Sequence, residues 1–261
     1  MMNMGRQFRQ RQWAWQEELK QHLYTPVAEV AMEGFVTKER LSVEQAQAHS
    51  FLPFSEGTAW GGCWEYGWFR ADVTLPDACD GRRVVLLGKL GGEQLYYLNG
   101  KAIGSIDKGH DYVTLTRCAK AGETVHLLAE SYAGHGARLE AATPCPPERP
   151  PIPPTPEQQC VMGKNVLAVW NEDAYQLLMD VYTLTQLLKV LPEKSLRYQR
   201  VGAALQAYAD IADFELPYQA RHESFRKARE ALRAALGCHN GSTAPLMWLI
   251  GQSHIDLAWL W

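Results

Sequence analysis

The stretch Trp68–Leu75, WFRADVTL, decides the fold class of this chain of 261 residues. Every second residue from Phe69 to Leu75 is apolar, and the residues between them are polar. A period of two is typical of a half-buried antiparallel strand, with one face on a core and the other in water. Pro76 and Asp77 end the pattern, as expected for a turn.

The residues that follow Leu75 repeat this strand signal. Asn99-Gly100 separates two strand-like runs and favours a tight hairpin, because both residues can adopt a positive φ. The predicted strands are 83–87, 94–98, 113–116 and 124–129, with one more over 161–170. Short strands separated by frequent turn signals indicate an antiparallel β-sandwich rather than an alternating α/β unit.

Helical patterns lie on both sides of the predicted strands. The apolar spacing in residues 7–23 predicts a helix that ends before Thr25-Pro26. Three more helices are predicted between Asn171 and Gly237, where apolar residues recur at steps of three and four. We therefore expect several domains: a helical arm (1–26), the β-sandwich (27–170) with a proline-rich crossing segment (143–156), a helical linker (171–240) and the start of an α/β domain (241–261).

The end of the chain, LMWLIGQSHIDLAWLW, carries the strongest functional pattern. Its apolar run, 246–250, has the length of a strand buried on both faces, as in a parallel sheet. His254 and Asp256 follow the run, and in an extended chain both side chains leave on the same side. Zn²⁺ accepts imidazole nitrogen and carboxylate oxygen, so the pair could supply half of a ligand set. On spacing alone, a structural histidine beside an aspartate is the commoner case, but the end of a buried strand favours a site.

Composition excludes several classes of function. The formal net charge of -3, from 26 basic and 29 acidic residues, gives no basic surface for a nucleic acid. We expect no signal peptide and no membrane span, because no window is long and apolar enough. The six cysteines form no C-x-x-C pair, which favours free thiols in a reducing cytoplasm. The sequence does not fix the oligomeric state, and a homo-oligomer is one alternative.

Three stretches together carry a resemblance to a known family: GSTAPLMWLIGQSHIDLAWLW (241–261), WGGCWEYGWFRADVTLP (60–76) and GGEQLYYLNGKAIGSIDKGH (91–110). The first resembles the start of the catalytic barrel in the glycoside hydrolase family 38 α-mannosidases, in their bacterial and cytosolic branch. The other two resemble the N-terminal β-sandwich of that branch. The resemblance implies a jelly-roll, galactose-binding-like sandwich, then a helical linker, then the first strand of a truncated α/β barrel.

The resemblance also implies roles for single residues. His254 and Asp256 match the first two ligands of the family's catalytic Zn²⁺, and Trp259 matches a tryptophan that lines the bound mannose. Ser253 stands where the family often has His or Ala. The family hydrolyses terminal α-linked mannose of oligosaccharides with retention, using an aspartate nucleophile and a carboxylic acid. Both carboxylates and the last histidine ligand lie beyond the matching residues, so we expect an incomplete zinc site, no catalytic residue in this chain and no activity of the chain alone.

Two other functions compete with this one. The tryptophans Trp60, Trp64 and Trp68 could make the sandwich a non-catalytic carbohydrate-binding module, although burial in a core is the more common fate of such aromatics. The H-x-D pair could also belong to another metal-dependent hydrolase, although the sandwich disfavours this.

Overall fold

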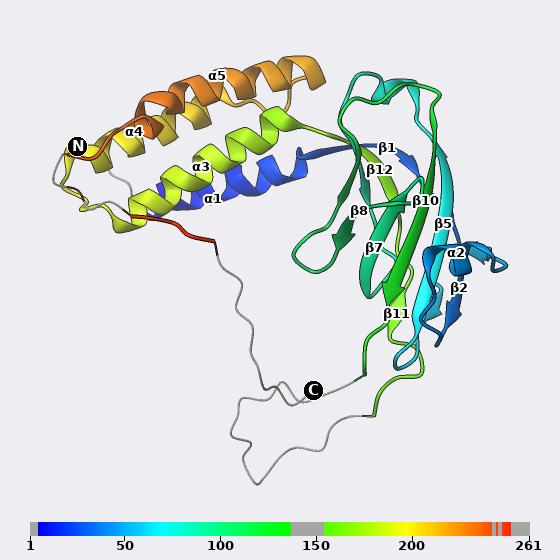
Figure 1. Ribbon diagram of the computed structural model, residues 1–261. Helices are drawn as coiled ribbons and strands as arrows, with labels where there is room; N and C mark the ends of the chain where they lie inside the picture. Colours follow the sequence, from blue (N-terminus) through cyan, green and yellow to red (C-terminus); the bar gives the residue numbers. More distant parts are fainter. Residues whose placement is uncertain (1–4, 137–153, 242–243, 245–246, 252–261) are drawn as a thin grey trace, which may run out of the picture. The chain divides into compact units, whose positions relative to one another are not determined.

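The computed structural model describes residues 5–136, 154–241, 244 and 247–251 (Figure 1). The chain divides into two compact units. One unit is continuous and covers Leu19–Tyr175, and the other combines Met1–Glu18 with Gln176–Trp261.

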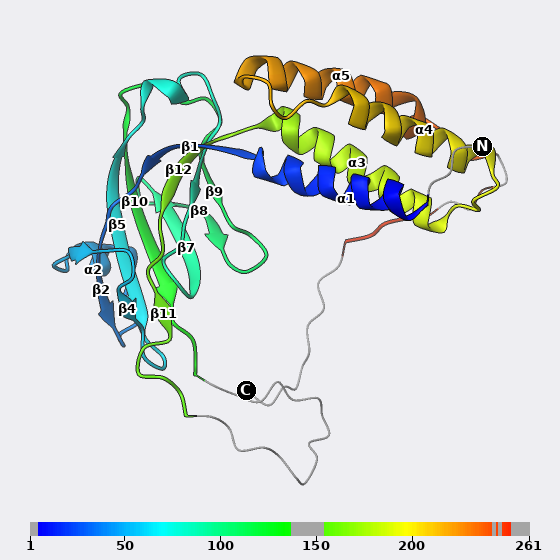
Figure 2. The same cartoon turned by 180° about the vertical axis from the view of Figure 1, so that it is seen from behind.

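The unit Leu19–Tyr175 is an antiparallel β-sandwich, whose central strands β5, β10 and β7 lie side by side (Figure 2). Its six-stranded sheet has the order β3-β2-β5-β10-β7-β8, with β2 at Met32–Thr37, β3 at Leu52–Phe54, β5 at Tyr66–Thr74, β7 at Glu93–Leu98, β8 at Lys101–Ile106 and β10 at Thr124–Tyr132. Its four-stranded sheet has the order β1-β12-β6-β9, with β1 at Tyr24–Glu29, β6 at Val84–Leu87, β9 at Val113–Thr116 and β12 at Val166–Trp170. A short pair joins β4 at Ala59–Trp60 to β11 at Cys160–Val161, and a 3-10 turn, η1, covers Asp77–Cys79.

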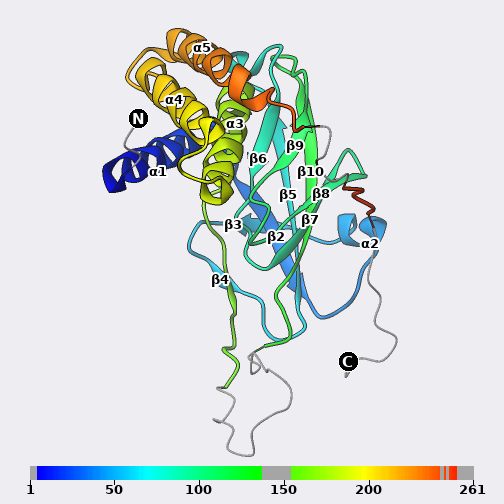
Figure 3. The same cartoon turned by 90° about the vertical axis from the view of Figure 1, so that its left-hand side faces the viewer.

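The outer face of the six-stranded sheet carries a small helix, α2 (Val43–Gln47), which lies next to this sheet (Figure 3). Ser42 caps the helix by accepting from the Gln45 N–H, and the Gln45 side chain accepts from the Ser42 N–H. Ala46 of the helix packs on Trp68 and Leu128, which point outward from β5 and β10. Part of this outer face is therefore covered.

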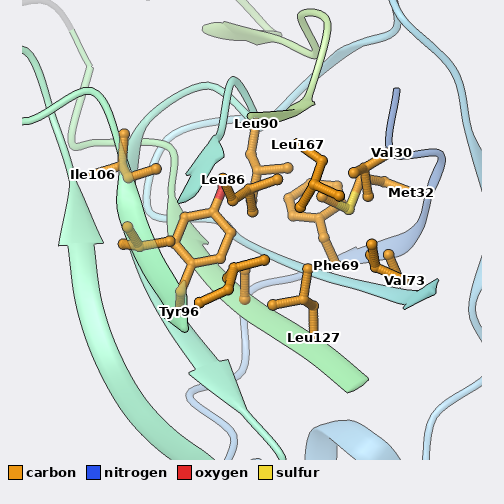
Figure 4. Close-up of a cluster of buried hydrophobic side chains, with 14 of the residues drawn as sticks. Val30, Met32, Phe69, Val73, Leu86, Leu90, Tyr96, Ile106, Leu127 and Leu167 are labelled. Atoms are coloured by element: carbon orange, nitrogen blue, oxygen red, sulfur yellow. The ribbon is translucent and has the colours of Figure 1, made fainter. Parts of the chain in front are cut away.

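The main core lies between the two large sheets (Figure 4). Alternate residues of the paired strands β5 and β10 point inward, including Phe69 and Leu127. They meet Leu86 of β6 and Leu167 of β12, and all four side chains are almost fully buried. The alternation at Trp68–Leu75 thus has the cause that the sequence predicts.

Gly88 makes room for the buried ring of Tyr96 in this core. Tyr96 is fully buried, and its hydroxyl donates to Gln94 Oε1 at 2.7 Å. A Cβ atom on Gly88 would lie 2.0 Å from the Tyr96 hydroxyl oxygen, closer than any non-bonded contact. The glycine is therefore required by the close approach of the tyrosine.

The second unit is helical, and its helices run alongside one another in Figures 1 and 2. It contains α3 at Glu172–Val190, α4 at Leu196–Ile211 and α5 at Tyr218–Leu236, together with most of α1 at Arg6–Gln21. The Gln12 amide of α1 donates to the Leu205 carbonyl of α4 at 3.1 Å, and Arg229 of α5 pairs with Asp180 of α3 at 2.7 Å. Helix α1 is therefore hydrogen-bonded to α4, and α5 is joined to α3 by an ion pair.

The structure confirms most of the predicted elements. The alternating stretches correspond to β5, β6, β7, β9 and β10, and the helical patterns correspond to α1, α3, α4 and α5. Asn99 and Gly100 adopt φ of 49° and 79°, as a hairpin turn of this kind requires. The single strand predicted over 161–170 is two short strands, β11 and β12.

The strand predicted at 246–250 as the beginning of an α/β barrel is not confirmed. Met247–Ile250 have no regular secondary structure, and their side chains are 80 to 90% exposed. A parallel strand needs hydrogen-bonding neighbours, and the described residues place none beside this run. Leu246 lies outside the described residues.

Candidate functional site

The residues predicted to bind zinc and sugar, His254, Asp256 and Trp259, lie outside the described residues. Within the part of the chain that the structure describes, no group of three or more histidine, cysteine, aspartate or glutamate side chains could hold a metal ion. The described residues therefore contain no candidate metal site of their own.

The three tryptophans proposed as a sugar-binding cluster do not share a surface. Trp60 is 2% exposed in the main core, where its indole N–H donates to the Leu90 carbonyl at 2.7 Å. Trp68 is 1% exposed on the opposite side of the sheet, beneath α2. Both are packing residues, and only Trp64 reaches the surface.

Trp64 is 61% exposed and adopts a φ of 64°. The left-handed region is unfavourable for a bulky side chain, by about 1–3 kcal/mol. Two hydrogen bonds help to hold the loop: the Trp64 N–H donates to the Gly134 carbonyl at 2.9 Å, and the Gly62 N–H donates to Glu65 Oε2 at 2.7 Å. The large apolar ring of Trp64 is thus exposed to solvent, and its backbone adopts a conformation that is unfavourable for this residue type.

Two tyrosines continue from Trp64 across the outer face of the six-stranded sheet. Tyr66 of β5 lies directly opposite Tyr132 of β10, with ring centroids 5.2 Å apart and planes inclined by 34°. The Trp64 ring lies 6.4 Å from the Tyr132 ring, at 40°. We call Trp64, Tyr66 and Tyr132 the aromatic strip. Tyr66 lies two residues before Trp68, so the alternation of Trp68–Leu75 assigns it to the outer, polar face of the strand. The sequence does not indicate its neighbour Tyr132.

A hollow of about 410 Å³ adjoins the aromatic strip, and we call it the acidic hollow. It lies among the two tyrosines of the strip and Glu93, Leu95, Ser105, Asp107 and Glu130. Glu93 stands opposite Tyr132 across the β10–β7 pair, and Leu95 stands opposite Glu130. The hollow therefore combines a partly apolar floor with side chains that accept hydrogen bonds.

The carboxylates of the acidic hollow are in different states. Burial raises the pKa of Glu130, while the nearby Arg40 lowers it in part. The pKa of Asp107 lies below its usual value because the Gly109 N–H and the His110 side chain hydrogen-bond the charged form. Glu93 is exposed. The carboxylates of the acidic hollow therefore differ in how readily they lose a proton, Asp107 more readily than usual and Glu130 less.

A second aromatic group, on the four-stranded sheet, is arranged for packing. Tyr24, Tyr112 and Trp170 contact one another edge-on or tilted, with centroids 5.0 to 5.8 Å apart. The Arg83 guanidinium lies 4.5 Å from the centre of the Trp170 ring, and the Tyr24 hydroxyl donates to Asp111 at 3.1 Å. Burial, followed by the charge of Asp111, raises the pKa of Tyr24. These rings are already engaged with each other.

The fold and the strand order define the class of the larger unit as a jelly-roll β-sandwich. The sequence profile described as "Alpha-mannosidase, jelly roll domain" matches residues 25–151. The chain is similar to α-mannosidases in this jelly-roll domain, and it resembles the N-terminal portion of these proteins over most of its length.

Curated relatives carry the same family name. "Alpha-mannosidase 2C1" of Mus musculus is 28% identical over 254 residues, covering 93% of this chain and 23% of that protein. "Alpha-mannosidase G" of Dictyostelium discoideum is 25% identical over 233 residues, covering 85% of this chain and 20% of that protein. The chain therefore spans less than a quarter of the length of these relatives.

Solved structures resemble the chain only slightly. The β-glucuronidase of Faecalibacterium prausnitzii is 17% identical, with a TM-score of 0.37 over 57% of this chain and 31% of that chain. A likeness this low carries no weight for function. Among the described residues, no helix is long and apolar enough to cross a membrane.

Proposed function

We propose that this chain is the N-terminal part of a zinc-dependent, retaining α-mannosidase that removes terminal α-linked mannose from oligosaccharides. The observation that carries the proposal is the match to the mouse relative over 93% of the chain. A match of this extent includes α3, α4 and α5 as well as the jelly roll, so it concerns more than one widespread domain. Another type of metal-dependent hydrolase does not explain the jelly-roll match.

His254 and Asp256 are the zinc ligands of this proposal, and Trp259 lies against the sugar. Their donor atoms, one imidazole nitrogen and one carboxylate oxygen, suit Zn²⁺, which takes three or four protein ligands in most sites. When bound, the ion would supply a Lewis acid that holds and orients sugar hydroxyls. The described residues contribute no further cluster of ligands. Within the described residues, the predicted pair therefore gains no further ligand cluster, and we expect the chain by itself to be inactive.

The first test is a calorimetric titration of this chain with zinc chloride. Because an incomplete ligand set in an unfinished site binds metal weakly, we expect no stoichiometric uptake in the micromolar range. Tight uptake that disappears in a His254→Ala variant would contradict the half-site and would show that these residues complete a centre by themselves.

The second test uses a protein in which this chain is continued to the length of its relatives. We expect hydrolysis of p-nitrophenyl α-mannoside but not of the β-anomer, loss of activity on chelation and recovery with zinc. Asp256→Asn should abolish recovery, since it replaces a carboxylate ligand with a neutral amide. NMR of the first product should show the α-anomer, as retention requires. Activity that is insensitive to chelators, or a first product of β configuration, would refute the proposal.

We also propose a cytoplasmic location. The five described cysteines, Cys63, Cys79, Cys118, Cys160 and Cys238, are all free thiols. Scattered free thiols are typical of proteins of reducing compartments. Fractionation of the native host would test this, and recovery in a secreted fraction would contradict it.

A further inference from the structure

The aromatic strip is not explained by packing. Trp64 gives up burial of its large ring while its backbone adopts a conformation that glycine would adopt without cost. Both features cost free energy in the folded chain, although the ring has Tyr132 and His135 as neighbours. Residues kept in such conformations against their preference concentrate at binding surfaces, so the position of Trp64 requires a reason outside the fold.

The sheet places the other members of the strip with Trp64. Direct cross-strand pairing puts Tyr66, Tyr132 and Glu93 in one row across β5, β10 and β7, on the outer face. The rings are inclined by 34° and 40° to their neighbours, so together they form a curved surface rather than a flat stack. One end of this surface meets the acidic hollow, which both tyrosines line.

We propose that the aromatic strip and the acidic hollow form a binding site for a neutral oligosaccharide of hexose units. The C–H faces of pyranose rings pack on exposed aromatic rings, and their hydroxyls donate to carboxylates such as Glu93 and Asp107. Successive sugars in a chain are rotated against each other, which a curved series of rings can follow. The site shares no residue with the zinc half-site, and it does not depend on the mannosidase activity proposed above.

A cationic peptide is the less suitable ligand for the same surface. The two tyrosines of the strip line the acidic hollow, but Trp64 does not, so the strip extends beyond the carboxylates at the end that Trp64 occupies. The hollow is also partly neutralised, because Arg40 acts on Glu130. A ligand that uses both regions therefore combines apolar faces with many hydroxyl donors.

The test is titration of the chain with α-1,6-mannobiose, maltotriose and cellotriose, followed by calorimetry and by ¹H–¹⁵N NMR. Open, shallow sites bind weakly, so we expect a Kd on the order of 1 mM for at least one probe. Shifts should include the indole N–H of Trp64 and the backbone of Tyr132. The same probe should bind equally well to a variant with both His254→Ala and Asp256→Ala.

The decisive variant is Trp64→Gly. It should lower affinity by about tenfold or more, which corresponds to about 1.4 kcal/mol, while the melting temperature stays the same or rises because glycine accepts the positive φ. Tyr132→Ala should weaken binding similarly. Trp13→Ala removes a tryptophan of similar exposure, 66%, from α1 and should change nothing.

Three results would overturn the proposal. One is the absence of binding for all three sugars at 20 mM in the wild-type chain. Another is binding that persists unchanged in both Trp64→Gly and Tyr132→Ala. The third is binding of an arginine-rich peptide at the strip in preference to every sugar. A lower melting temperature of Trp64→Gly would assign Trp64 a packing role and also count against the proposal.

Discussion

Two apolar runs of this chain have similar composition and opposite surroundings. Val84–Leu87 (VVLL) forms β6, and its first three residues are 0% exposed. Met247–Ile250 (MWLI) forms no strand in the described chain, and its residues are at least 80% exposed. Strand β6 lies between β12 and β9, which pair with its backbone on both sides. Apolar residues thus favour burial, but an apolar run forms a strand only where neighbouring strands can hydrogen-bond with its backbone.

Leucine-to-alanine substitutions in the two runs should give the largest contrast. Leu86→Ala leaves a cavity in the main core and should lower the free energy of unfolding by about 3–4 kcal/mol. Leu249→Ala should change it by less than about 0.5 kcal/mol, because the side chain is 90% exposed. Urea unfolding monitored by fluorescence measures both. Equal losses would mean that Leu249 is buried in solution.

A methyl group added beside β6 should have a smaller but clear effect. Gly88→Ala puts a Cβ in the place of the Tyr96 hydroxyl and should cost about 2–3 kcal/mol. Gly241→Ala is the matched control, since no atom lies within 4 Å of its added Cβ. Combining Gly88→Ala with Tyr96→Phe should recover part of the loss. Full stability of Gly88→Ala alone would show that Tyr96 moves aside freely.

The same dependence on surroundings should hold for ion pairs of the helical unit. Arg229 reaches Asp180 on another helix, and the Asp180 side chain is only 19% exposed. Arg226 pairs with Glu223 on its own helix, with both side chains about half exposed. Arg229→Met should cost about 1 kcal/mol and Arg226→Met almost nothing, as measured by thermal unfolding. A larger loss for Arg226→Met would reverse this ranking.

The smallest effect concerns Glu130, a carboxylate in partly buried surroundings. Because burial raises its pKa in the folded chain, the folded state holds the proton more tightly than the unfolded state. The resulting cost is absent below the unfolded pKa of about 4.3 and grows as the pH rises through the folded value. Glu130→Gln should therefore stabilise the chain by less than about 1 kcal/mol at pH 7 and not at pH 3. Urea midpoints at both pH values test this, and stabilisation at pH 3 alone would contradict the sign.

Sequence periodicity predicted the strands that are half-buried and the helices with an apolar face. It missed β1, β2 and β3, and in each of the first two strands one residue obscured the pattern. β1 contains Pro26, which is tolerated because the strand lies at the sheet edge and has an irregular register there. β2 contains Gly34, whose lack of a side chain lets Phe69 pack within the core. Both residues read as turn signals, and only the tertiary packing explains them.

The candidate sites were less accessible to such reasoning. Trp60, Trp64 and Trp68 are four residues apart in the sequence, yet they lie in the core, at the surface and beneath α2. Nothing in the local sequence indicates the positive φ of Trp64, because it depends on the contact with Gly134. The pairing of Tyr66 with Tyr132 joins strands that are far apart in the sequence. For the zinc half-site, the motif of His254 and Asp256 remains the basis of the prediction.

The strands by which the chain enters and leaves the sandwich are partners: Tyr24 of β1 lies opposite Trp170 of β12. In the sequence, the sandwich is thus an insertion between α1 and α3, and its first and last strands, β1 and β12, are paired with each other. During synthesis, the sandwich can fold before α3, α4 and α5 are made, whereas α1 has its helical partners only after that. The same arrangement would let one sandwich replace another in a relative without altering the spacing of the helices on either side of it.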